Sequence, residues 1–369
     1  MDVIELTRCL VAFDTINPPG GEAEAMRFVA GLLGEAGFDC REITQGEGRC
    51  NLVATRGLAG EAKALGFTGH LDTVPLGAAA WRHPPHEAVV ADGRIHGRGT
   101  SDMKGGVAAF VCAAMEGPTP PGGIALLITA GEETGSDGAK CIVAAGDLPD
   151  IGALIVAEPT LNRALPGHKG ALWLKLIARG VTSHGSMPEE GVNAVMIMAR
   201  ALSVLDGFVP GPVHPIMGPA TCNVGMIHGG LNINSVPDLC EVTIDMRSVP
   251  GTDHAAMRAA LAERIGPAIE IVTLIDLPSV WSDPADPWVA SLAGLARDLA
   301  GADPAPASVP YFTDASVFTP ALGDVATVIL GPGDPALAHK TDESVAIDRL
   351  QQAQAIFAAA LGDWDGRAR

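Results

Sequence analysis

A histidine and an aspartate lie two residues apart directly after an apolar stretch. The segment 69–75 reads Gly-His-Leu-Asp-Thr-Val-Pro and follows the apolar run 64–68. Alternate residues of a strand point to the same side, so His70 and Asp72 can act together at the carboxyl end of a strand. An imidazole that binds zinc needs its second nitrogen anchored, and an acid two residues on suits that task. The alternative for so short a pattern is a structural histidine beside a turn.

Further acids follow the other apolar runs. Asp102 lies in a glycine-rich loop, Glu132 and Glu133 follow the run 124–129, and Glu158 follows the run 153–157. The carboxyl ends of parallel strands meet at one rim of a sheet, where ligands bind. A single carboxylate in an acidic chain is usually solvated, but several at one rim would repel each other unless cations neutralised them. This arrangement therefore points to a metal site.

The residues between these positions predict the elements that carry them. Short and nearly continuous apolar runs are typical of strands covered by helices on both faces, and apolar positions three and four apart predict helices. The predicted strands are 64–68, 124–129, 153–157 and 326–330, and the predicted helices are 2–13, 22–36, 107–115, 287–300 and 346–361. The expected fold class is α/β, with a mostly parallel sheet flanked by helices.

The middle of the chain has a different pattern. Residues 171–178, 221–228 and 239–247 alternate between apolar and polar, as half-exposed strands do, and 192–205 and 253–263 predict helices. We therefore expect an α+β domain with one open sheet over residues 167–277. It is inserted into a catalytic domain formed by residues 1–166 and 278–369.

Five motifs resemble those of one enzyme family. They are GHLDTVP (69–75), GRGTSDMKGG (97–106), GEE (131–133), AEPT (157–160) and AHKTDE (338–343). The family is that of acetylornithine deacetylase, succinyl-diaminopimelate desuccinylase, aminoacylase and carboxypeptidase G, which are dinuclear zinc hydrolases. The motifs occur in the family's order over nearly the whole chain. The resemblance implies a zinc-binding catalytic domain and an inserted lid domain that forms a dimer.

The resemblance also implies which residues bind the metals. His70 and Glu158 would bind one zinc, Glu133 and His339 would bind the other, and Asp102 would bridge the two. Cobalt is expected to substitute for zinc. The peptide bond after Asp102 is expected to be cis.

Two more residues are implied to act at this site. Asp72 would orient His70, and Glu132 would be the general base that takes a proton from water and passes it to the leaving amine. Neighbouring side chains on a turn face different directions, so Glu132 can face the substrate while Glu133 faces the metal.

The inserted domain contributes three further candidates. The segment 181–188 resembles the family's dimerisation motif, whose histidine, here His184, reaches the partner subunit's site and steadies the oxyanion. Asn232 or Asn234, together with Arg247, resemble residues that hold the substrate's carboxylate. A guanidinium suits that planar, bidentate contact. The alternative for Arg247 is a salt bridge to Asp245 or another acid.

Two glycines near the C-terminus are candidates for substrate binding through their backbone. At Gly331 and Gly333, backbone N–H groups could approach a substrate carboxylate or acyl oxygen. Residues 313–315, Thr-Asp-Ala, favour the acetylornithine deacetylase branch over the desuccinylase branch.

Composition excludes several classes of partner. The formal net charge is −19, so a phosphate backbone or an anionic membrane surface would be repelled. The seven cysteines are scattered without a Cys-x-x-Cys pair, and no apolar run is long enough for a membrane span. The chain begins MDVIELTRCL, which does not resemble a signal peptide. We expect a cytoplasmic homodimer that binds neither nucleic acid nor membrane.

The expected activity is zinc-dependent removal of an acyl group from a small N-acyl amino acid. A dipeptidase or a glutamate carboxypeptidase of the same family is the alternative, because these enzymes share the metal site and differ in the substrate pocket. A non-catalytic peptide-binding relative would be expected to lack Glu132 or a ligand, and all are present.

Overall fold

The computed structural model describes residues 1–209 and 211–366, which divide into two compact units. The larger unit comprises Met1–Gly167, Trp281–Ala307 and the described residues from Thr313 on. The smaller unit comprises His168–Val280 and Ser308–Phe312. Two short strands, β8 (Gly167–His168) and β15 (Val280–Trp281), lie where the chain passes from one unit to the other. Within the described residues, none of the helices has both the length and the apolar character needed to cross a membrane.

The larger unit is built on a six-stranded sheet in the order β1-β2-β6-β3-β7-β16. Its strands are β1 (Asp39–Gly46), β2 (Arg49–Arg56), β3 (Ala64–His70), β6 (Ile124–Thr129), β7 (Ile151–Val156) and β16 (Ala326–Ile329). The four strands from β6 to β16 are parallel, whereas β1 and β2 pair antiparallel. The α/β expectation is confirmed. The sequence analysis did not include β1 and β2. β1 is a partly exposed edge strand with few apolar residues, whereas β2 is mostly buried.

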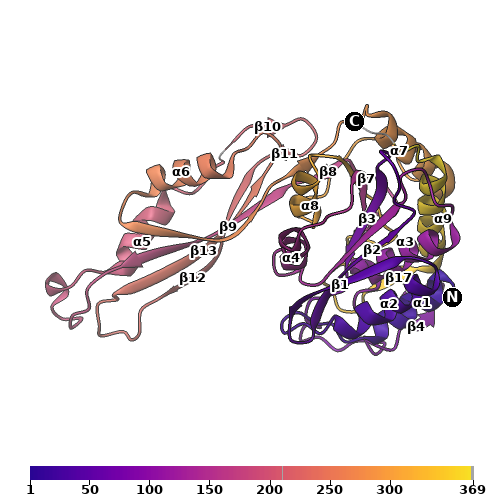
Figure 1. Ribbon diagram of the computed structural model, residues 1–369. Helices are drawn as coiled ribbons and strands as arrows, with labels where there is room; N and C mark the ends of the chain where they lie inside the picture. The colour runs from indigo at the N-terminus through magenta and orange to yellow at the C-terminus, as the bar shows by residue number, and fades with distance from the viewer. Residues whose placement is uncertain (210, 367–369) are drawn as a thin grey trace. The chain divides into compact units, whose positions relative to one another are not determined.

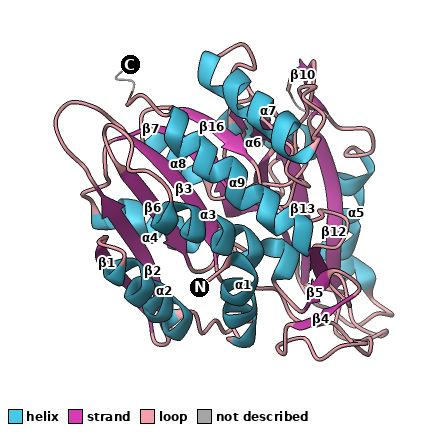
Figure 2. Ribbon diagram, turned by 90° about the vertical axis from the view of Figure 1, so that its right-hand side faces the viewer, coloured by secondary structure: helices cyan, strands magenta, loops and turns pink. Residues whose placement is uncertain are grey.

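Helices cover both faces of this sheet (Figures 1 and 2). One face carries α1 (Val3–Ala12), α2 (Ala23–Glu35), α3 (Gly105–Glu116), α7 (Pro287–Ala300) and α9 (Ile347–Asp363), and the other carries α4 (Asp137–Ala145) and α8 (Ala315–Ala321). A small antiparallel sheet is formed by β4 (Val89–Ala91), β5 (Arg94–His96) and β17 (Ser344–Ala346).

Local sequence explains where these elements begin and how closely they pack. At the start of α1, the Asp2 side chain accepts a hydrogen bond from the Glu5 N–H and the Glu5 side chain accepts one from the Asp2 N–H, a capping box. At the start of α3, a β-carbon on Gly106 would lie 2.1 Å from the Ala157 carbonyl oxygen, so only glycine lets this helix approach the end of β7.

The core of the larger unit lies between the sheet and α3 and α9. Phe67 on β3 is fully buried and packs against Phe110 and Phe357, with ring centroids 5.8 Å and 5.5 Å apart. Burying a side chain of this size contributes roughly 1.5–3 kcal/mol. The strands that end at the candidate site are therefore firmly held.

The smaller unit is an antiparallel sheet in the order β12-β13-β9-β14. Its strands are β9 (Gly170–Arg179), β12 (Thr221–Gly229), β13 (Leu239–Ser248) and β14 (Ile269–Leu277), with a short hairpin of β10 (Val213–His214) and β11 (Gly218–Pro219). Two helices, α5 (Ala194–Ser203) and α6 (His254–Ile265), and a short helical turn, η2 (Pro188–Glu190), complete the unit. Alternate residues of β13 are buried in the core with α5 and α6, whereas most of the edge strand β12 is exposed. The predicted open sheet is therefore confirmed, with β14 as a strand that the sequence analysis did not locate.

Candidate metal centre

The ends of three neighbouring strands bring the predicted ligands together. His70 is the last residue of β3, Glu132 and Glu133 follow β6, and Glu158 follows β7. Two groups have ligand atoms within 4.8 Å of one another, namely His70, Asp102 and Glu133, and His70, Glu132 and Glu158. Because both groups share His70, they form one continuous cluster.

Asp102 lies between the two histidines of this cluster. His70 Nε2 is 3.3 Å from one Asp102 oxygen, Oδ1, and His339 Nε2 is 3.3 Å from the other, Oδ2. The same nitrogen of each histidine also faces a glutamate, with Glu158 Oε1 3.6 Å from His70 Nε2 and Glu133 Oε2 3.1 Å from His339 Nε2. One carboxylate that presents an oxygen to each of two His–Glu pairs is the arrangement that a dinuclear site requires.

Asp102 lies in an irregular helical turn, η1 (Thr100–Lys104), just before α3. Its backbone is extended rather than helical, with φ −125° and ψ 95°. The Asp102–Met103 peptide bond is cis, which confirms the expectation from the sequence.

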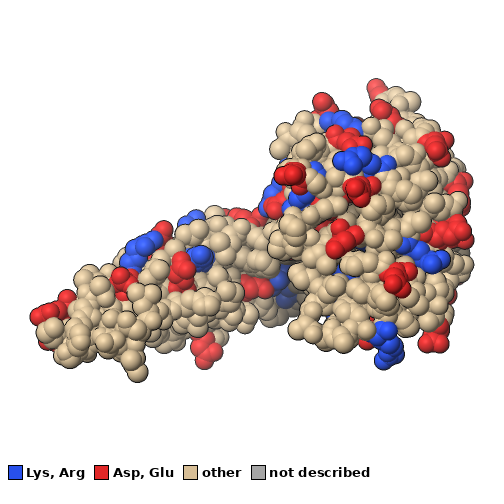
Figure 3. Space-filling model, turned by 90° about the horizontal axis from the view of Figure 1, so that it is seen from below, with Lys and Arg blue, Asp and Glu red and all other residues tan. Residues whose placement is uncertain are grey.

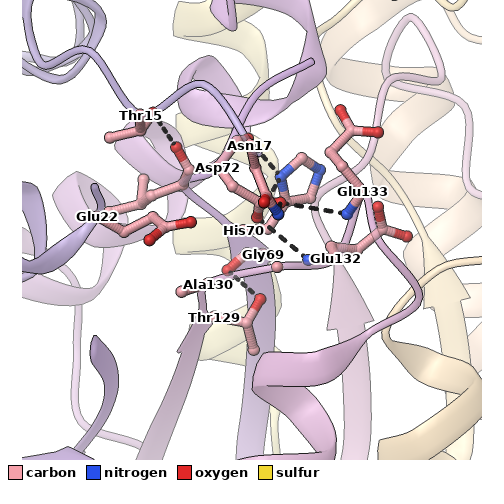
Figure 4. Close-up of polar contacts among 12 residues, drawn as sticks. Thr15, Asn17, Glu22, Gly69, His70, Asp72, Thr129, Ala130, Glu132 and Glu133 are labelled. Atoms are coloured by element: carbon pink, nitrogen blue, oxygen red, sulfur yellow. Dashed lines mark hydrogen bonds and ion pairs between the residues drawn. The ribbon is translucent and has the colours of Figure 1, made fainter. Parts of the chain in front are cut away.

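Asp72 has two roles, one for its backbone and one for its carboxylate (Figure 4). The Asp72 carbonyl oxygen is 2.9 Å from His70 Nδ1, and the carboxylate Oδ1 is 3.5 Å from the same nitrogen. The carboxylate accepts hydrogen bonds from the backbone N–H groups of Glu132 and Glu133, both at 3.2 Å. Asp72 thus anchors His70 mainly through its backbone and fixes the turn that carries both glutamates through its side chain.

Asn17 is a residue that the sequence analysis did not identify as part of the site. Its buried side chain donates hydrogen bonds to Asp72 Oδ2 at 3.0 Å and to Thr134 Oγ1 at 3.2 Å (Figure 4). The only signal in the sequence is its position before Pro18 and Pro19, a pattern typical of loops. The loop therefore contributes to the hydrogen bonds that hold the Glu132 turn.

Burial concentrates negative charge around these histidines. Glu132 and Glu158 are only 6% and 4% exposed. Burial raises the pKa of both carboxyl groups well above the ordinary value, and His70 lowers both pKa values in part. Negative neighbours add to the rise: Glu158 raises the pKa of Glu132, and Asp102 raises the pKa of Glu158. A positive charge at the centre of the cluster would relieve this repulsion.

The pKa values of the two histidines are raised as well, which favours their charged form. Burial disfavours the charged form of His70, but the neighbouring Asp102 and Asp72 carboxylates raise its pKa well above the ordinary value. Asp102 and Glu133 raise the pKa of His339 to about 10. Burial also opposes ionisation of Asp102, yet its bonds to both histidines hold its pKa below the usual range. The surroundings thus favour cations at both histidine positions.

The donor atoms fit bound divalent metal ions. His70 Nε2 is buried and has no hydrogen-bond partner within residues 1–209 and 211–366, although it points at two carboxylates. Imidazole nitrogens and carboxylate oxygens are the ligands that zinc takes in catalytic sites. Because Nδ1 of His70 is anchored, Nε2 is the atom that could bind a metal ion.

The candidates in the smaller unit are mostly exposed. His184 is exposed and its Nδ1 lies 2.7 Å from Ser186 Oγ. Asn232 and Asn234 are exposed too, in the loop that follows β12.

Arg247 on β13 forms the salt bridge that was its alternative interpretation. Its Nε and Nη2 donate to Asp245 at 2.8 Å and 3.0 Å, and the guanidinium lies 5.9 Å from the ring centroids of Trp173 and Phe312. The remaining nitrogen, Nη1, has no hydrogen-bond partner in the described part of the chain. One edge of the guanidinium is fixed by Asp245, and one nitrogen remains for another acceptor.

The two glycines near the C-terminus are required by packing. A β-carbon on Gly331 would lie 2.2 Å from the Ala157 carbonyl oxygen, and one on Gly333 would lie 2.2 Å from the Ser101 carbonyl oxygen. The Gly331 N–H donates to Thr160 Oγ1 at 3.1 Å. Gly333 therefore lets its loop pack directly against the loop that carries Asp102.

The smaller unit also contains a hydrogen-bonded serine, histidine and aspartate. His254 Nε2 lies 2.6 Å from Ser248 Oγ, and His254 Nδ1 lies 2.6 Å from Asp276 Oδ1. A cavity of about 410 Å³ is lined by His254 and Asp276 but not by Ser248, which is fully buried. A nucleophile must be accessible to substrate, so this chain of hydrogen bonds joins β13, α6 and β14 rather than forming a serine hydrolase site.

Comparisons with known proteins agree with the geometry of the larger unit. Residues 66–363 match the model of peptidase family M20/M25/M40. A succinyl-diaminopimelate desuccinylase from Cereibacter sphaeroides is 31% identical over 385 residues, covering 99% of both chains. An M20 family metallo-carboxypeptidase from Sulfolobus solfataricus superposes with a TM-score of 0.83 at 19% identity, covering 98% of this chain and 99% of its own. A tripeptidase from Staphylococcus aureus superposes with a TM-score of 0.76 at 25% identity over 98% of both chains.

Proposed function

The chain belongs to peptidase family M20/M25/M40 and is a metallohydrolase, and from this premise we propose that it removes the acyl group of a small N-acyl amino acid with the help of two zinc ions. The observation that carries the proposal is the position of Asp102, which presents one oxygen to His70 and the other to His339. Asp102 would bridge two metal ions, one bound by His70 and Glu158 and the other by Glu133 and His339.

Zinc ions bound in this way would polarise the scissile carbonyl and lower the pKa of a water molecule to roughly 7. Glu132 then acts as the general base, taking a proton at its carboxylate and delivering it to the leaving nitrogen. Two features support this role. Its backbone N–H is held by Asp72, and its buried carboxylate lies within 4.8 Å of ligand atoms of His70 and Glu158.

The substrate proposal is an N-acyl amino acid with a free carboxylate. Arg247, which has one nitrogen without a hydrogen-bond partner in residues 1–209 and 211–366, would bind that carboxylate, assisted by Asn232 or Asn234. The name of the Cereibacter relative supports a succinyl group, whereas residues 313–315 favour an acetyl group. We therefore keep both acyl groups as candidates.

A peptidase is the second candidate. The observation that favours it is the similarity to solved structures named as a carboxypeptidase and a tripeptidase, over almost the entire chain. A peptide bond and an N-acyl bond are both amides, so the same metal site would act on either. The two activities would differ in the residues that bind the acyl side of the scissile bond.

One experiment separates these candidates. Enzyme loaded with zinc or cobalt is assayed on N-succinyl, N-acetyl and N-formyl amino acids and on simple dipeptides, with Glu132→Gln as the matched control. We expect at least one N-acyl amino acid to be hydrolysed with a kcat/KM well above that of the dipeptides. Preference for the dipeptides would favour the peptidase, and no hydrolysis of either class would contradict the proposed function.

We also propose that the working unit is a homodimer formed through the smaller unit. Leu231 and Ile233, in the loop after β12, are 91% and 103% exposed, and β12 is an edge strand with unpaired backbone groups on one side. Closed twofold dimers are the commonest way to cover such a surface. His184 would then serve the active site of the partner subunit. On the face drawn in Figure 3, acidic side chains are interspersed with Lys and Arg side chains. The formal net charge of −19 supports a small-molecule substrate rather than nucleic acid or an anionic membrane.

A further inference from the structure

Glu343 has a buried side chain that four donors surround. It lies four residues after His339 and directly before β17, and its exposed fraction is 0%. Its Oε1 accepts hydrogen bonds from the backbone N–H groups of Ser101 and Asp102, at 2.8 Å and 3.0 Å. Its Oε2 accepts hydrogen bonds from the Gly99 N–H at 3.0 Å and from Arg98 Nη1 at 2.7 Å. Both oxygens are thus occupied by protein donors.

These contacts fix the backbone that presents Asp102. Gly99 is left-handed, with φ 82°, and the turn that follows directs three N–H groups toward one carboxylate. Successive N–H groups arranged in this way form an anion-binding concavity. Because the Asp102 N–H is one of the three, a change in Glu343 would move the residue whose oxygens face both histidines.

The backbone of Glu343 and its ion-pair partner Arg98 hold the loop that presents His339. His339 and Asp342 both have φ 61°, a left-handed conformation that non-glycine residues rarely adopt and that surrounding structure must maintain. The Glu343 carbonyl oxygen accepts a hydrogen bond from the Gly97 N–H at 3.0 Å. Arg98 Nη1 also donates to the Lys340 carbonyl oxygen at 3.2 Å.

Arg98 completes this connection. It is 1% exposed, its Nη2 donates to the Pro75 carbonyl oxygen at 3.0 Å, and its guanidinium lies 5.1 Å from the ring centroid of Trp81. The Arg98–Glu343 pair therefore joins the segment after β3, the Asp102 loop and the His339 loop. A charged pair inside a protein is costly unless further hydrogen bonds satisfy it. Here, within the described residues, both Glu343 oxygens and both terminal nitrogens of Arg98 have partners, and Arg98 Nε has none.

We propose that Glu343 is a positioning residue that holds Asp102 and His339 at the spacing needed for two metal ions. The inference rests on the proposed dinuclear function and deepens it by naming what keeps the bridging ligand and the exposed histidine together. Without the Glu343 carboxylate, the Asp102 N–H loses its acceptor and Arg98, which holds the His339 loop, loses its ion-pair partner. His70 and Glu158 remain fixed at the ends of β3 and β7. The metal ion on the His339 side should therefore be released first.

Glu343→Gln tests this inference. A glutamine amide has one acceptor oxygen and one donor nitrogen, so one of the two donor pairs would face another donor. We expect two zinc ions in wild-type protein. In the variant, one of the two should bind about 10- to 100-fold more weakly, the loss typical when a partner of a metal ligand is removed. At saturating zinc, kcat should largely recover, because Glu343 touches no substrate.

The matched control is Glu22→Gln. Glu22 is another fully buried carboxylate in the larger unit, and it accepts hydrogen bonds from Arg49 Nη2 and Nε at 2.9 Å and 3.1 Å. It contacts no backbone N–H of a proposed ligand, so this variant should keep both zinc affinities within about twofold. The affinities are measured by competition with a chelating dye, with circular dichroism to confirm folding.

Each outcome decides the matter. Unchanged zinc affinities in Glu343→Gln, or equal weakening in both variants, would overturn the positioning role while leaving the dinuclear function intact. If Glu343→Gln does not fold, Arg98→Lys replaces it. This variant keeps the three backbone donors and should weaken zinc binding at one site by several-fold. Unchanged zinc affinities in Arg98→Lys would overturn the inference. Wild-type protein that binds no zinc would instead refute the proposed function, and the inference with it.

Discussion

His70 in the larger unit and His168 in the smaller unit are buried to the same degree, with exposed fractions of 1% and 0%. In both, Nδ1 lies 2.9 Å from a backbone carbonyl oxygen, that of Asp72 or that of Lys169. In both, Nε2 is buried and has no hydrogen-bond partner within residues 1–209 and 211–366. By burial and backbone contacts alone, either histidine would qualify as a metal ligand.

The difference between them is the charge around Nε2. Asp102 and Glu158 place oxygens 3.3 Å and 3.6 Å from His70 Nε2, and the pKa of His70 is well above its ordinary value despite burial. Burial lowers the pKa of His168 to about 4. An anchored, buried imidazole therefore becomes a metal-site candidate only where carboxylates converge on its free nitrogen.

The largest expected effect is the loss of kcat on replacing Glu132, a carboxylate near His70 that is not assigned as a metal ligand. Glu132→Gln should keep two zinc ions but lose roughly 10²–10⁴-fold in kcat, because the general base is removed. Turnover and metal content are measured on the same preparation. The companion variant Glu133→Gln should lose zinc instead, and the reverse pattern would mean that the two glutamates have exchanged roles.

The contrast between His70 and His168 can also be tested by the pH dependence of the free energy of unfolding. In the unfolded chain the pKa of His168 is about 6.5, so as pH falls from about 6.5 to about 4 the unfolded state binds a proton that the folded state excludes. Stability should therefore fall across this range by about 3 kcal/mol and level off below it. Urea unfolding of chelator-treated protein is compared between wild type and His168→Asn, which should lack this part of the loss. Parallel pH curves would show that His168 is not buried in the neutral form.

Arg247 tests whether the smaller unit binds the substrate's carboxylate. Arg247→Lys should lower kcat/KM by about 10- to 100-fold, mainly through KM, because a hydrogen bond between charged groups contributes about 1.5–3 kcal/mol. Lys175→Ala is the control, since Lys175 lies in the same sheet in an ion pair with Glu241 at 3.6 Å. Equal effects of the two variants would restrict Arg247 to its salt bridge with Asp245.

The smallest effect concerns His184 and the dimer. Chains with His184→Ala and chains with Glu132→Ala are each expected to form inactive homodimers. When the two are co-expressed, half of the dimers are mixed and each has one complete site, so about a quarter of wild-type activity should return. No return of activity would place His184 in its own chain's site, and a fully active monomer would contradict the dimer.

His70, Glu133 and Glu158 could be predicted to lie close together because each follows an apolar run, whereas Asp102 and His339 were assigned from the family resemblance. His70 and Glu158 follow strands that are recognisable from composition, and the strand ends of a parallel sheet must meet. Asn17 and Glu343 could not be assigned roles in this way. Their partners lie 55 residues away at Asp72 and more than 240 residues away at Asp102, and nothing local encodes those hydrogen bonds. The exposed edge strand β1 was missed for a related reason, since its residues carry little apolar pattern.

The most direct test of the dinuclear account is a titration of metal-free enzyme with zinc, in which bound metal and hydrolysis of the best N-acyl amino acid are measured together. The account predicts no activity in excess chelator and a rise in activity that levels off at two zinc ions per chain. Asp102→Asn should weaken both binding steps, because the two histidines face the two oxygens of this single carboxylate. Full turnover without metal, or a plateau at one zinc with Asp102→Asn unimpaired, would contradict it.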